Sequence, residues 1–222
     1  MLKAEMHTHC KDDPEDVIKY SAEELIEEAA KQGFDVLSIT LHKKLFYPRR
    51  YVKAAKKHGI LLIPGVELRL EDCDVLAYNV TASDVKGVKK LNDLNKIRRK
   101  ETLIVAPHPF LPLANSLKGK FNEYHALFDA IEHTFFYHKY FRFWNKKAIA
   151  AGKYFNIPVV GNSDVHKLWN LGNTYTLIDS KKDKASVIAA IKAGKVKLVS
   201  KPLLTRRFLE IPYKEYRYKL PF

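Results

Sequence analysis

Two histidines, His7 and His9, stand two residues apart in the segment EMHTHC, directly after a short apolar stretch. Side chains in a strand alternate between its two faces, so positions 7 and 9 point the same way. Four later strand-like segments also end in residues able to bind a metal ion, namely Thr40-Leu41-His42, Pro64-Gly65-Val66-Glu67, Pro107-His108-Pro109 and Asn162-Ser163-Asp164-Val165-His166. Because burying so many imidazoles and carboxylates without partners is costly, five such endings indicate one shared polar site.

Imidazole and carboxylate groups together are typical ligands of divalent metal ions. Imidazole suits Zn, Fe and Mn, whereas carboxylates suit Mn and Mg and can bridge two ions. The candidate ligands exceed the needs of one tetrahedral ion, so the pattern predicts two or three ions. Two ions roughly 4 Å apart can generate a hydroxide and clamp the oxygens of a displacement at phosphorus.

The elements that must position these residues alternate between strand and helix patterns. The clearest helix covers residues 21–33, where Ser21 and Glu24 can form a capping box and Gly33 ends the helix. Further helices are predicted at 47–59, 82–100, 143–156 and 184–194, between strands at 34–40, 60–68, 74–80, 102–110, 130–133, 157–166, 174–179 and 195–200. Strands separated by such helices predict right-handed crossovers and a parallel α/β barrel. In a barrel of this kind, chemistry gathers at the carboxyl ends of the strands.

The composition limits the class of protein. The chain has 222 residues with 46% hydrophobic content, enough for one large domain. Its two cysteines, Cys10 and Cys73, form no pairing or C-x-x-C pattern, which favours a reducing compartment and disfavours a thiolate zinc site. The sequence has no apparent signal peptide and no apolar run of roughly 18 to 20 residues, so we expect a cytoplasmic protein without a membrane span.

The charge is strongly positive, with 39 Lys and Arg against 25 Asp and Glu, a balance of +14. A basic protein attracts polyanions such as nucleic acids, nucleotides and phosphorylated metabolites. The basic residues are spread along the chain rather than gathered in one cluster, so a solvated lysine-rich surface is an equally good interpretation. The charge therefore fits an anionic substrate without selecting one.

The order of the motifs HTH, T-x-H, P-G-V-E, A-P-H-P and N-S-D-V-H resembles the PHP family, named for polymerase and histidinol phosphatase. The resemblance extends over residues 4–200, including the ending SDVHKLWNLGNTYTLI. It implies a distorted (β/α)7 TIM-like barrel and a metal-dependent phosphoesterase with up to three ions of Mn, Zn or Fe. It also implies that Glu67 and Asp164 hold a metal-bridged hydroxide that attacks phosphorus.

The resemblance also assigns ligands to each ion. His7, His9 and Asp164 match the ligands of the first ion, and Glu67 matches the carboxylate that bridges the first and second. His108 matches a ligand of the second ion, whereas His42 and His166 match ligands of the third.

The sequence departs from the family pattern at three places. Leu41 stands where many members have an aspartate, so an acidic neighbour of the third ion is missing. Asp74 stands where a histidine is common, and it either ligates the second ion or leaves that site weaker; we favour ligation. The loop after HTH usually supplies a ligand to the third ion, and we prefer Asp16 to Asp13 for that role.

The remaining expectations concern the substrate and the ends of the barrel. Lys139 and Arg142 could hold a substrate phosphate, because a guanidinium group matches phosphate oxygens in pairs. The substrate is a phosphorylated small molecule or a nucleic acid, and the oligomeric state cannot be deduced. We expect one barrel domain over residues 1–200 and an irregular basic and aromatic extension, residues 201–222, packed on it. The competing hypothesis is a non-catalytic RNA-binding barrel related to the archaeal ribonuclease P protein subunit.

Overall fold

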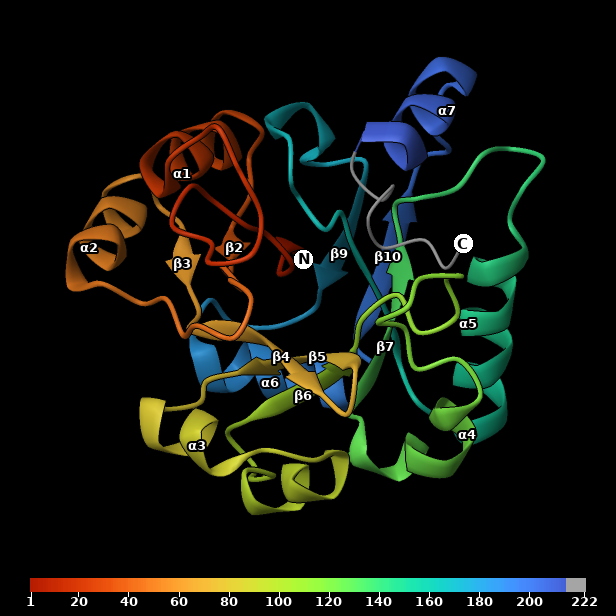
Figure 1. The fold of residues 1–222 in the computed structure, drawn as a ribbon. Helices are drawn as coiled ribbons and strands as arrows, with labels where there is room; N and C mark the ends of the chain where they lie inside the picture. The colour runs from red at the N-terminus through yellow and green to blue at the C-terminus, as the bar shows by residue number, and fades with distance from the viewer. Residues whose placement is uncertain (215–222) are drawn as a thin grey trace.

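The computed structural model describes residues 1–214, of which residues 210–214 are described by their backbone alone, and it contains two five-stranded sheets (Figure 1). The first sheet has the order β10-β9-β1-β2-β3, and the second has the order β4-β5-β6-β7-β8. The strands of the first sheet are β1 (Leu2–Glu5), β2 (Val36–Leu37), β3 (Leu61–Leu62), β9 (Thr174–Ile178) and β10 (Val196–Ser200). Those of the second are β4 (Gly65–Leu70), β5 (Cys73–Tyr78), β6 (Leu103–Ala106), β7 (Ala130–Thr134) and β8 (Val159–Asn162).

The α/β class is confirmed, but both sheets are mixed rather than parallel. β1, β2 and β3 are parallel, whereas β9 is antiparallel to β1 and to β10. In the second sheet, β5 is antiparallel to β4 and β6, and only β6, β7 and β8 are parallel. The link between β4 and β5 is Glu71–Asp72, and both residues have positive φ, which suits a tight hairpin. Parallel strands need a crossover of a dozen or more residues, so this link excludes the predicted parallel arrangement.

The two sheets face each other around a shared core but do not form one closed hydrogen-bonded barrel in the part of the chain described here. The core includes Met6, which follows β1, and Val36 in β2 from the first sheet. Tyr78 in β5 and Val105 in β6 come from the second sheet, and Ile188 comes from the helix of residues 184–192. Two isolated parallel bridges join segments of the two sheets, Thr8 to Val165 and His42 to Glu67. Both bridges lie among the predicted metal ligands, so the sheets meet at the candidate site.

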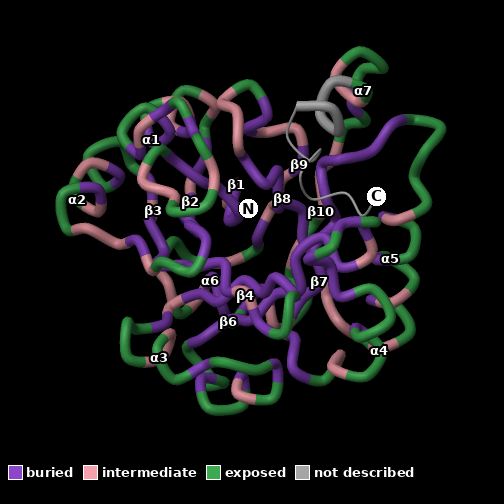
Figure 2. The backbone as a smooth tube through the Cα atoms, viewed as in Figure 1, coloured by how far each residue is buried: buried purple, intermediate pink, exposed green. Residues whose placement is uncertain are grey.

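The helices pack outside the sheets, and their outer faces are exposed (Figure 2). They are α1 (Ala22–Lys31), α2 (Arg49–Lys57), α3 (Ala82–Gly87), α4 (Lys120–Tyr124), α5 (Phe143–Phe155), α6 (Lys184–Lys192) and α7 (Thr205–Lys214). The capping box predicted for α1 is confirmed, because the Ser21 hydroxyl accepts from the Glu24 amide and the Glu24 carboxylate accepts from the Ser21 amide. None of the described helices is long and apolar enough to cross a membrane.

The single helix predicted over residues 82–100 is wrong. The segment contains α3 and then a 3-10 helix, Leu91–Lys96, separated by extended backbone at Val88. The Asp93 carboxylate accepts from the amides of Lys89 and Lys90 and so starts the second turn. The buried apolar residues of this segment, Val88, Leu91, Leu94 and Ile97, recur at every third position. This spacing fits a 3-10 helix as well as an α-helix.

The predicted strand 60–68 is also divided in two, because Pro64 separates β3 from β4 and the two strands belong to different sheets. Proline lacks the amide needed inside a sheet. The next residue, Gly65, lies so close to Ser38 and Thr40 that a Cβ atom would fall 2.3 Å from the Ser38 hydroxyl oxygen. The chain therefore changes sheets at a point where only glycine fits.

The extension after β10 is not irregular throughout, because residues 205–214 form α7. Leu203, just before this helix, and Phe208, in its first turn, pack with Phe135 and Phe136 in a small apolar cluster. Phe208 stacks on Phe136 with ring centroids 4.9 Å apart. The remainder of the predicted extension, residues 215–222, lies outside the described residues.

Candidate metal centre

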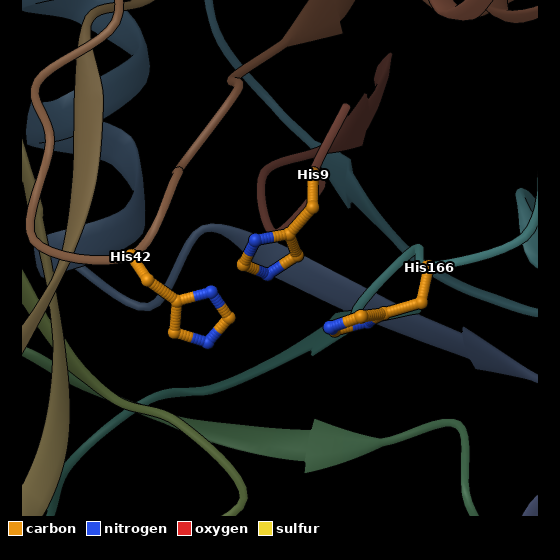
Figure 3. Close-up of side chains that lie close together, drawn as sticks. All are labelled: His9, His42 and His166. Carbon is orange, nitrogen blue, oxygen red and sulfur yellow. The ribbon is translucent and has the colours of Figure 1, made fainter. Parts of the chain in front are cut away.

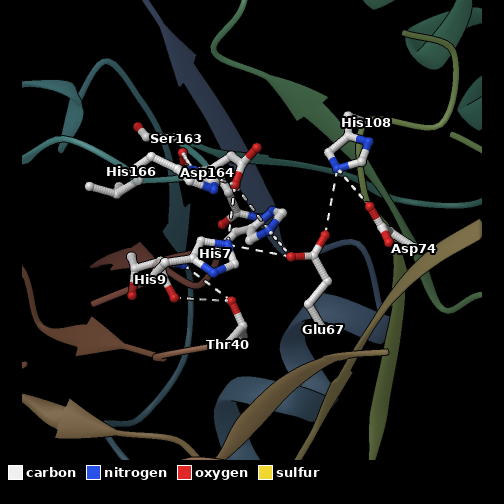
Figure 4. Close-up of polar contacts among 12 residues, drawn as sticks. His7, His9, Thr40, Glu67, Asp74, His108, Ser163, Asp164 and His166 are labelled. Carbon is white, nitrogen blue, oxygen red and sulfur yellow. Dashed lines mark hydrogen bonds and ion pairs between the residues drawn. The ribbon is translucent and has the colours of Figure 1, made fainter. Parts of the chain in front are cut away.

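The first group of ligand atoms comes from both sheets and is buried. His7 and His9 follow β1, Glu67 lies in β4 and Asp164 follows β8 (Figure 4). His7 Nε2 lies 3.3 Å from both Glu67 Oε2 and Asp164 Oδ1. His9 Nε2 lies 3.4 Å from Glu67 Oε2 and 3.3 Å from Asp164 Oδ1. The two histidines of the HTH motif therefore face the same two carboxylates, as their spacing in a strand predicts.

A second group consists of Glu67, Asp74 and His108. His108 Nε2 lies 3.6 Å from Glu67 Oε1 and 4.0 Å from Asp74 Oδ2. Asp74 is the second residue of β5, and because β5 runs antiparallel to β4 this position lies near the carboxyl end of β4. The reversed strand thus brings Asp74 to the same end of the molecule as the other candidates. Its carboxylate is also bound by Arg69 and Asn115.

A third group consists of His9, His42 and His166, which come together from three separate segments (Figure 3). The rings of His9 and His42 have centroids 4.6 Å apart, and those of His9 and His166 are 4.4 Å apart. Asp16 lies beside this group, with Oδ2 2.9 Å from His166 Nε2 and 3.8 Å from His42 Nδ1.

The two aspartates considered for the loop position have different surroundings. The Asp13 carboxylate lies 2.9 Å from His9 Nδ1 and 3.1 Å from His42 Nδ1, and it also accepts from the His42 amide. It is fully buried, whereas Asp16 is partly exposed. Asp13 thus holds the Nδ1 atoms of two histidines whose Nε2 atoms face Glu67, while Asp16 reaches the Nε2 atom of a third.

Two buried glutamates belong to the site and were missed by the sequence analysis. Glu132 in β7 lies 3.1 Å from His7 Nδ1 and accepts from the His108 amide at 3.0 Å. Glu5 in β1 accepts from the amides of His7 and Ser163 and so joins the HTH segment to the loop after β8. The only available signal was an acidic residue inside an otherwise apolar strand, which does not specify a partner.

The cluster pairs buried imidazoles with buried carboxylates, and the pKa values shift accordingly. Burial lowers the pKa of His7, but the nearby carboxylates, above all Asp164, outweigh it and raise that pKa well above its usual value. Burial opposes ionisation of Glu67, yet the imidazoles of His42 and His7 hold the pKa of Glu67 well below its usual range. At Asp74, burial is the dominant cause and raises the pKa to about 6. The site is therefore a dense array of mutually dependent charges.

The donor set fits divalent cations. Three sets of side chains offer ligand atoms that lie within 4.8 Å of one another. They are His7, His9 and Asp164; Glu67, Asp74 and His108; and His9, His42 and His166. Within the described structure, His7 Nε2, His9 Nε2 and Glu67 Oε2 are buried and make no hydrogen bond. Buried polar atoms are rarely left in this state, and a cation between them would satisfy all three. The three groups share residues and contacts. His9 belongs to two of them, and Glu67 lies beside a histidine of each.

The backbone is unusual at two candidate ligands. His108 has φ of 28° and Asp164 has φ of 43°, a region that residues with a Cβ atom adopt infrequently. Both residues lie two positions after the end of a strand of the second sheet, β6 for His108 and β8 for Asp164. Such conformations persist where surrounding contacts fix them, and they are concentrated at functional sites.

The structure does not bring every predicted residue to the cluster. Arg142 donates to the Lys139 carbonyl, and the Lys139 ammonium lies over the Tyr140 ring, so both side chains contact their own exposed loop. Leu41 is buried with Leu37 and Ile39 in an apolar cluster, whereas its neighbours Thr40 and His42 contact Thr8 and Glu67. The departure at position 41 therefore falls outside the polar array.

Comparison with family models shows where the chain belongs. Residues 5–142 match the model of the PHP domain, and residues 142–196 match the model of a PHP-associated region. Because the first match covers more than half of the chain, the protein belongs to the PHP domain family. This confirms the resemblance deduced from the five motifs.

Individual relatives are distant. An uncharacterised protein of Methanocaldococcus jannaschii is 23% identical over 151 residues, which cover 56% of this chain and 84% of that protein. The crystal structure of PsfC from Pseudomonas syringae aligns with a TM-score of 0.68 at 14% identity over 98% of both chains. A lesion-specific endonuclease from Pyrococcus furiosus aligns with a TM-score of 0.60 at 14% identity, covering 96% of this chain and 66% of the endonuclease. At this level of identity, the two solved structures establish the shared fold alone.

Proposed function

We propose that this protein is a metal-dependent phosphoesterase with a centre of two or three Mn, Zn or Fe ions. The observation that carries the proposal is the convergence of three ligand groups on Glu67, with buried, unbonded atoms on His7 and His9 beside it. A structural role explains this arrangement poorly, because removing so many ionisable groups from water is costly unless cations offset their charge. When bound, the ions would supply an activated water and positive charge for displacement at phosphorus.

The ligands fall into three sets in this proposal. The first set is His7, His9, Glu67 and Asp164; the second is Glu67, Asp74 and His108; the third is His42, His166 and Asp16, with His9 adjacent. Asp13 and Glu132 would bind the far nitrogen atoms of the histidines and fix the tautomer that presents Nε2 to the centre. This arrangement supports the choice of Asp16 over Asp13 as the loop ligand.

The substrate is an anionic phosphoester, either a nucleotide, an oligonucleotide or a small phosphorylated metabolite. The net charge of +14 supports an anionic substrate. The likeness of the fold to a lesion-specific endonuclease adds nucleic acid to the candidates. The contacts of Lys139 and Arg142 within their own loop give no support to their predicted role at the substrate phosphate.

Elemental analysis of the purified protein tests the proposal most directly. We expect bound Mn, Zn or Fe, loss of phosphoester hydrolysis after chelation, and recovery when one of these metals is added back. The substrates should include small monoesters, a chromogenic diester, and short RNA and DNA. Protein that carries no metal and hydrolyses none of these with added Mn, Zn or Fe would overturn the proposal.

The alternative of a non-catalytic RNA-binding barrel makes the opposite prediction. Such a protein needs its basic surface but has no use for a buried set of histidines and carboxylates. It should bind RNA equally well before and after chelation and contain no stoichiometric metal. The joint presence of His7, Glu67, His108 and Asp164 in one buried array favours the enzyme.

A further inference from the structure

A groove of about 1080 Å³ lies on the surface between α4, α5 and the loop of residues 107–119. The two helices lie at the right of Figure 1. Its lining is mainly apolar and aromatic and includes Phe110, Tyr154 and Phe155. Lys118 and Lys147 are the charged residues of the lining, and neither a carboxylate nor a histidine is among the described residues that form it. The groove therefore differs in chemistry from the metal cluster.

The sequence of α5 creates the floor of this groove. Lys147, Ala150, Ala151 and Tyr154 recur at intervals of three and four residues, so they lie on one face of the helix. The two alanines leave the face hollow between the longer side chains. Tyr154 stands at the rim with 83% of its surface exposed, and Phe155 is fixed beneath it by His125, whose ring lies 4.0 Å from the Phe155 ring. The Tyr154 ring makes an edge contact with Phe155, with centroids 4.8 Å apart, and the rest of its surface faces solvent, where a ligand ring can stack on it.

The combination of one exposed aromatic ring, two half-buried ones and lysines without acids indicates the class of ligand. Bases stack on aromatic side chains and phosphates pair with lysines, which is the usual chemistry of single-stranded nucleic acid binding. A second copy of this chain suits the groove poorly, because it would bring the same charge of +14. Charge complementarity thus favours a polyanion over self-association.

We propose that this groove, formed by α4, α5 and the loop 107–119, binds a single strand of nucleic acid whose scissile phosphate lies at the metal cluster. The proposal rests on the proposed function for its chemistry and adds the class of substrate. One loop links the two regions, because Phe110 in the groove lining lies two residues after His108, so their Cα atoms are no more than about 7 Å apart. The loop that carries a candidate ligand therefore also forms a wall of the groove.

Binding of a fluorescein-labelled oligothymidylate, followed by anisotropy in EDTA, tests the groove without any metal chemistry. We expect salt-dependent binding that weakens about tenfold in Tyr154→Ala, the scale of one lost base stack. Tyr154→Phe keeps the ring and should bind like the wild type. Ala150→Trp fills the floor from an exposed position and should weaken binding as well.

A charge reversal with a matched control tests the lysines. Lys147→Glu should weaken binding and lower the slope of log affinity against log salt. Lys53→Glu makes the same change in net charge at an exposed position of α2, on the opposite side of the molecule (Figure 1), and should have a much smaller effect. Equal effects of the two reversals would mean that the oligonucleotide is attracted by net charge alone, and the groove proposal would be wrong.

Two further outcomes separate the groove from the proposed function. If the wild type binds the oligonucleotide through Tyr154 but hydrolyses no phosphoester, the groove stands and the proposed function fails. If the protein hydrolyses phosphoesters but Tyr154→Ala binds oligothymidylate like the wild type, the groove proposal is wrong. A dimer that dissociates in Tyr154→Ala, with no oligonucleotide binding by the wild type, would also overturn it in favour of self-association.

Discussion

The metal cluster and the α4–α5 groove begin two residues apart, at His108 and Phe110, yet they have opposite physical character. The cluster is buried, polar and built from segments of both sheets. The groove is exposed, largely apolar and built from two consecutive helices and one loop. In the cluster, charged groups have been removed from water. In the groove, aromatic surface has been left in it.

Both regions carry an unfavourable free energy that a ligand would offset. Buried carboxylates need a positive counter-charge, and a cation supplies it without requiring the neighbouring imidazoles to be protonated. Exposed aromatic surface needs an apolar or stacking partner. The two kinds of deficit require different ligands, a cation in one case and a polyanion with flat bases in the other. Substitutions in one region should therefore leave the ligand of the other unaffected.

The largest effect is expected for His9→Ala, because His9 belongs to two of the three ligand groups. Loss of a group that merely orients a ligand typically costs 10- to 100-fold in metal affinity or activity, so loss of this ligand should cost more than roughly a hundredfold in turnover. Elemental analysis and hydrolysis at saturating metal measure the loss, and circular dichroism verifies the fold. The same variant should bind oligothymidylate in EDTA like the wild type. Normal turnover of His9→Ala would show that His9 is not a ligand of the metal centre.

A smaller loss is expected for Glu132→Gln, which keeps the size of the side chain but removes the charge facing His7 Nδ1. The histidine would then be less strongly held and less basic, so metal affinity should fall by about 10- to 100-fold. Competition with a chelating dye measures the affinity. Glu123→Gln is a matched control, because Glu123 is exposed on α4. If both variants bind metal equally well, Glu132 does not position a ligand.

The sequence was most informative where a local pattern has a local cause. The HTH spacing placed two side chains on one face, and the Ser21 and Glu24 pair marked the start of α1. The order of strand endings predicted a common site, and the structure brings His42, His108 and Asp164 together there. These inferences needed only the periodicity of a strand, the chemistry of a cap and the family motifs.

The remaining features depend on contacts between distant segments. Glu5 and Glu132 are single acids in apolar strands, and only the folded chain reveals that they face His7. The reversal of β5 follows from a two-residue hairpin at Glu71 and Asp72, which lacks the glycine or asparagine typical of such turns. The groove depends on small residues of α5 meeting a loop some 35 residues earlier, a distance in sequence at which no motif connects them.

The smallest effect concerns His133, which is buried one residue from Glu132 but faces Tyr137 rather than a carboxylate. Burial lowers the pKa of His133 to about 4, the reverse of the shift at His7. The unfolded chain takes up a proton near pH 6.5 and the folded chain only near pH 4, so this residue reduces stability as the pH falls between those values. From pH 8 to pH 5 the wild type should lose about 2 kcal/mol of stability through this residue, and His133→Gln should lack that loss, as measured by urea unfolding in EDTA. Exposed His58→Gln is the matched control. If the free energy of unfolding of His133→Gln depends on pH as that of the wild type does, burial does not lower the pKa of His133.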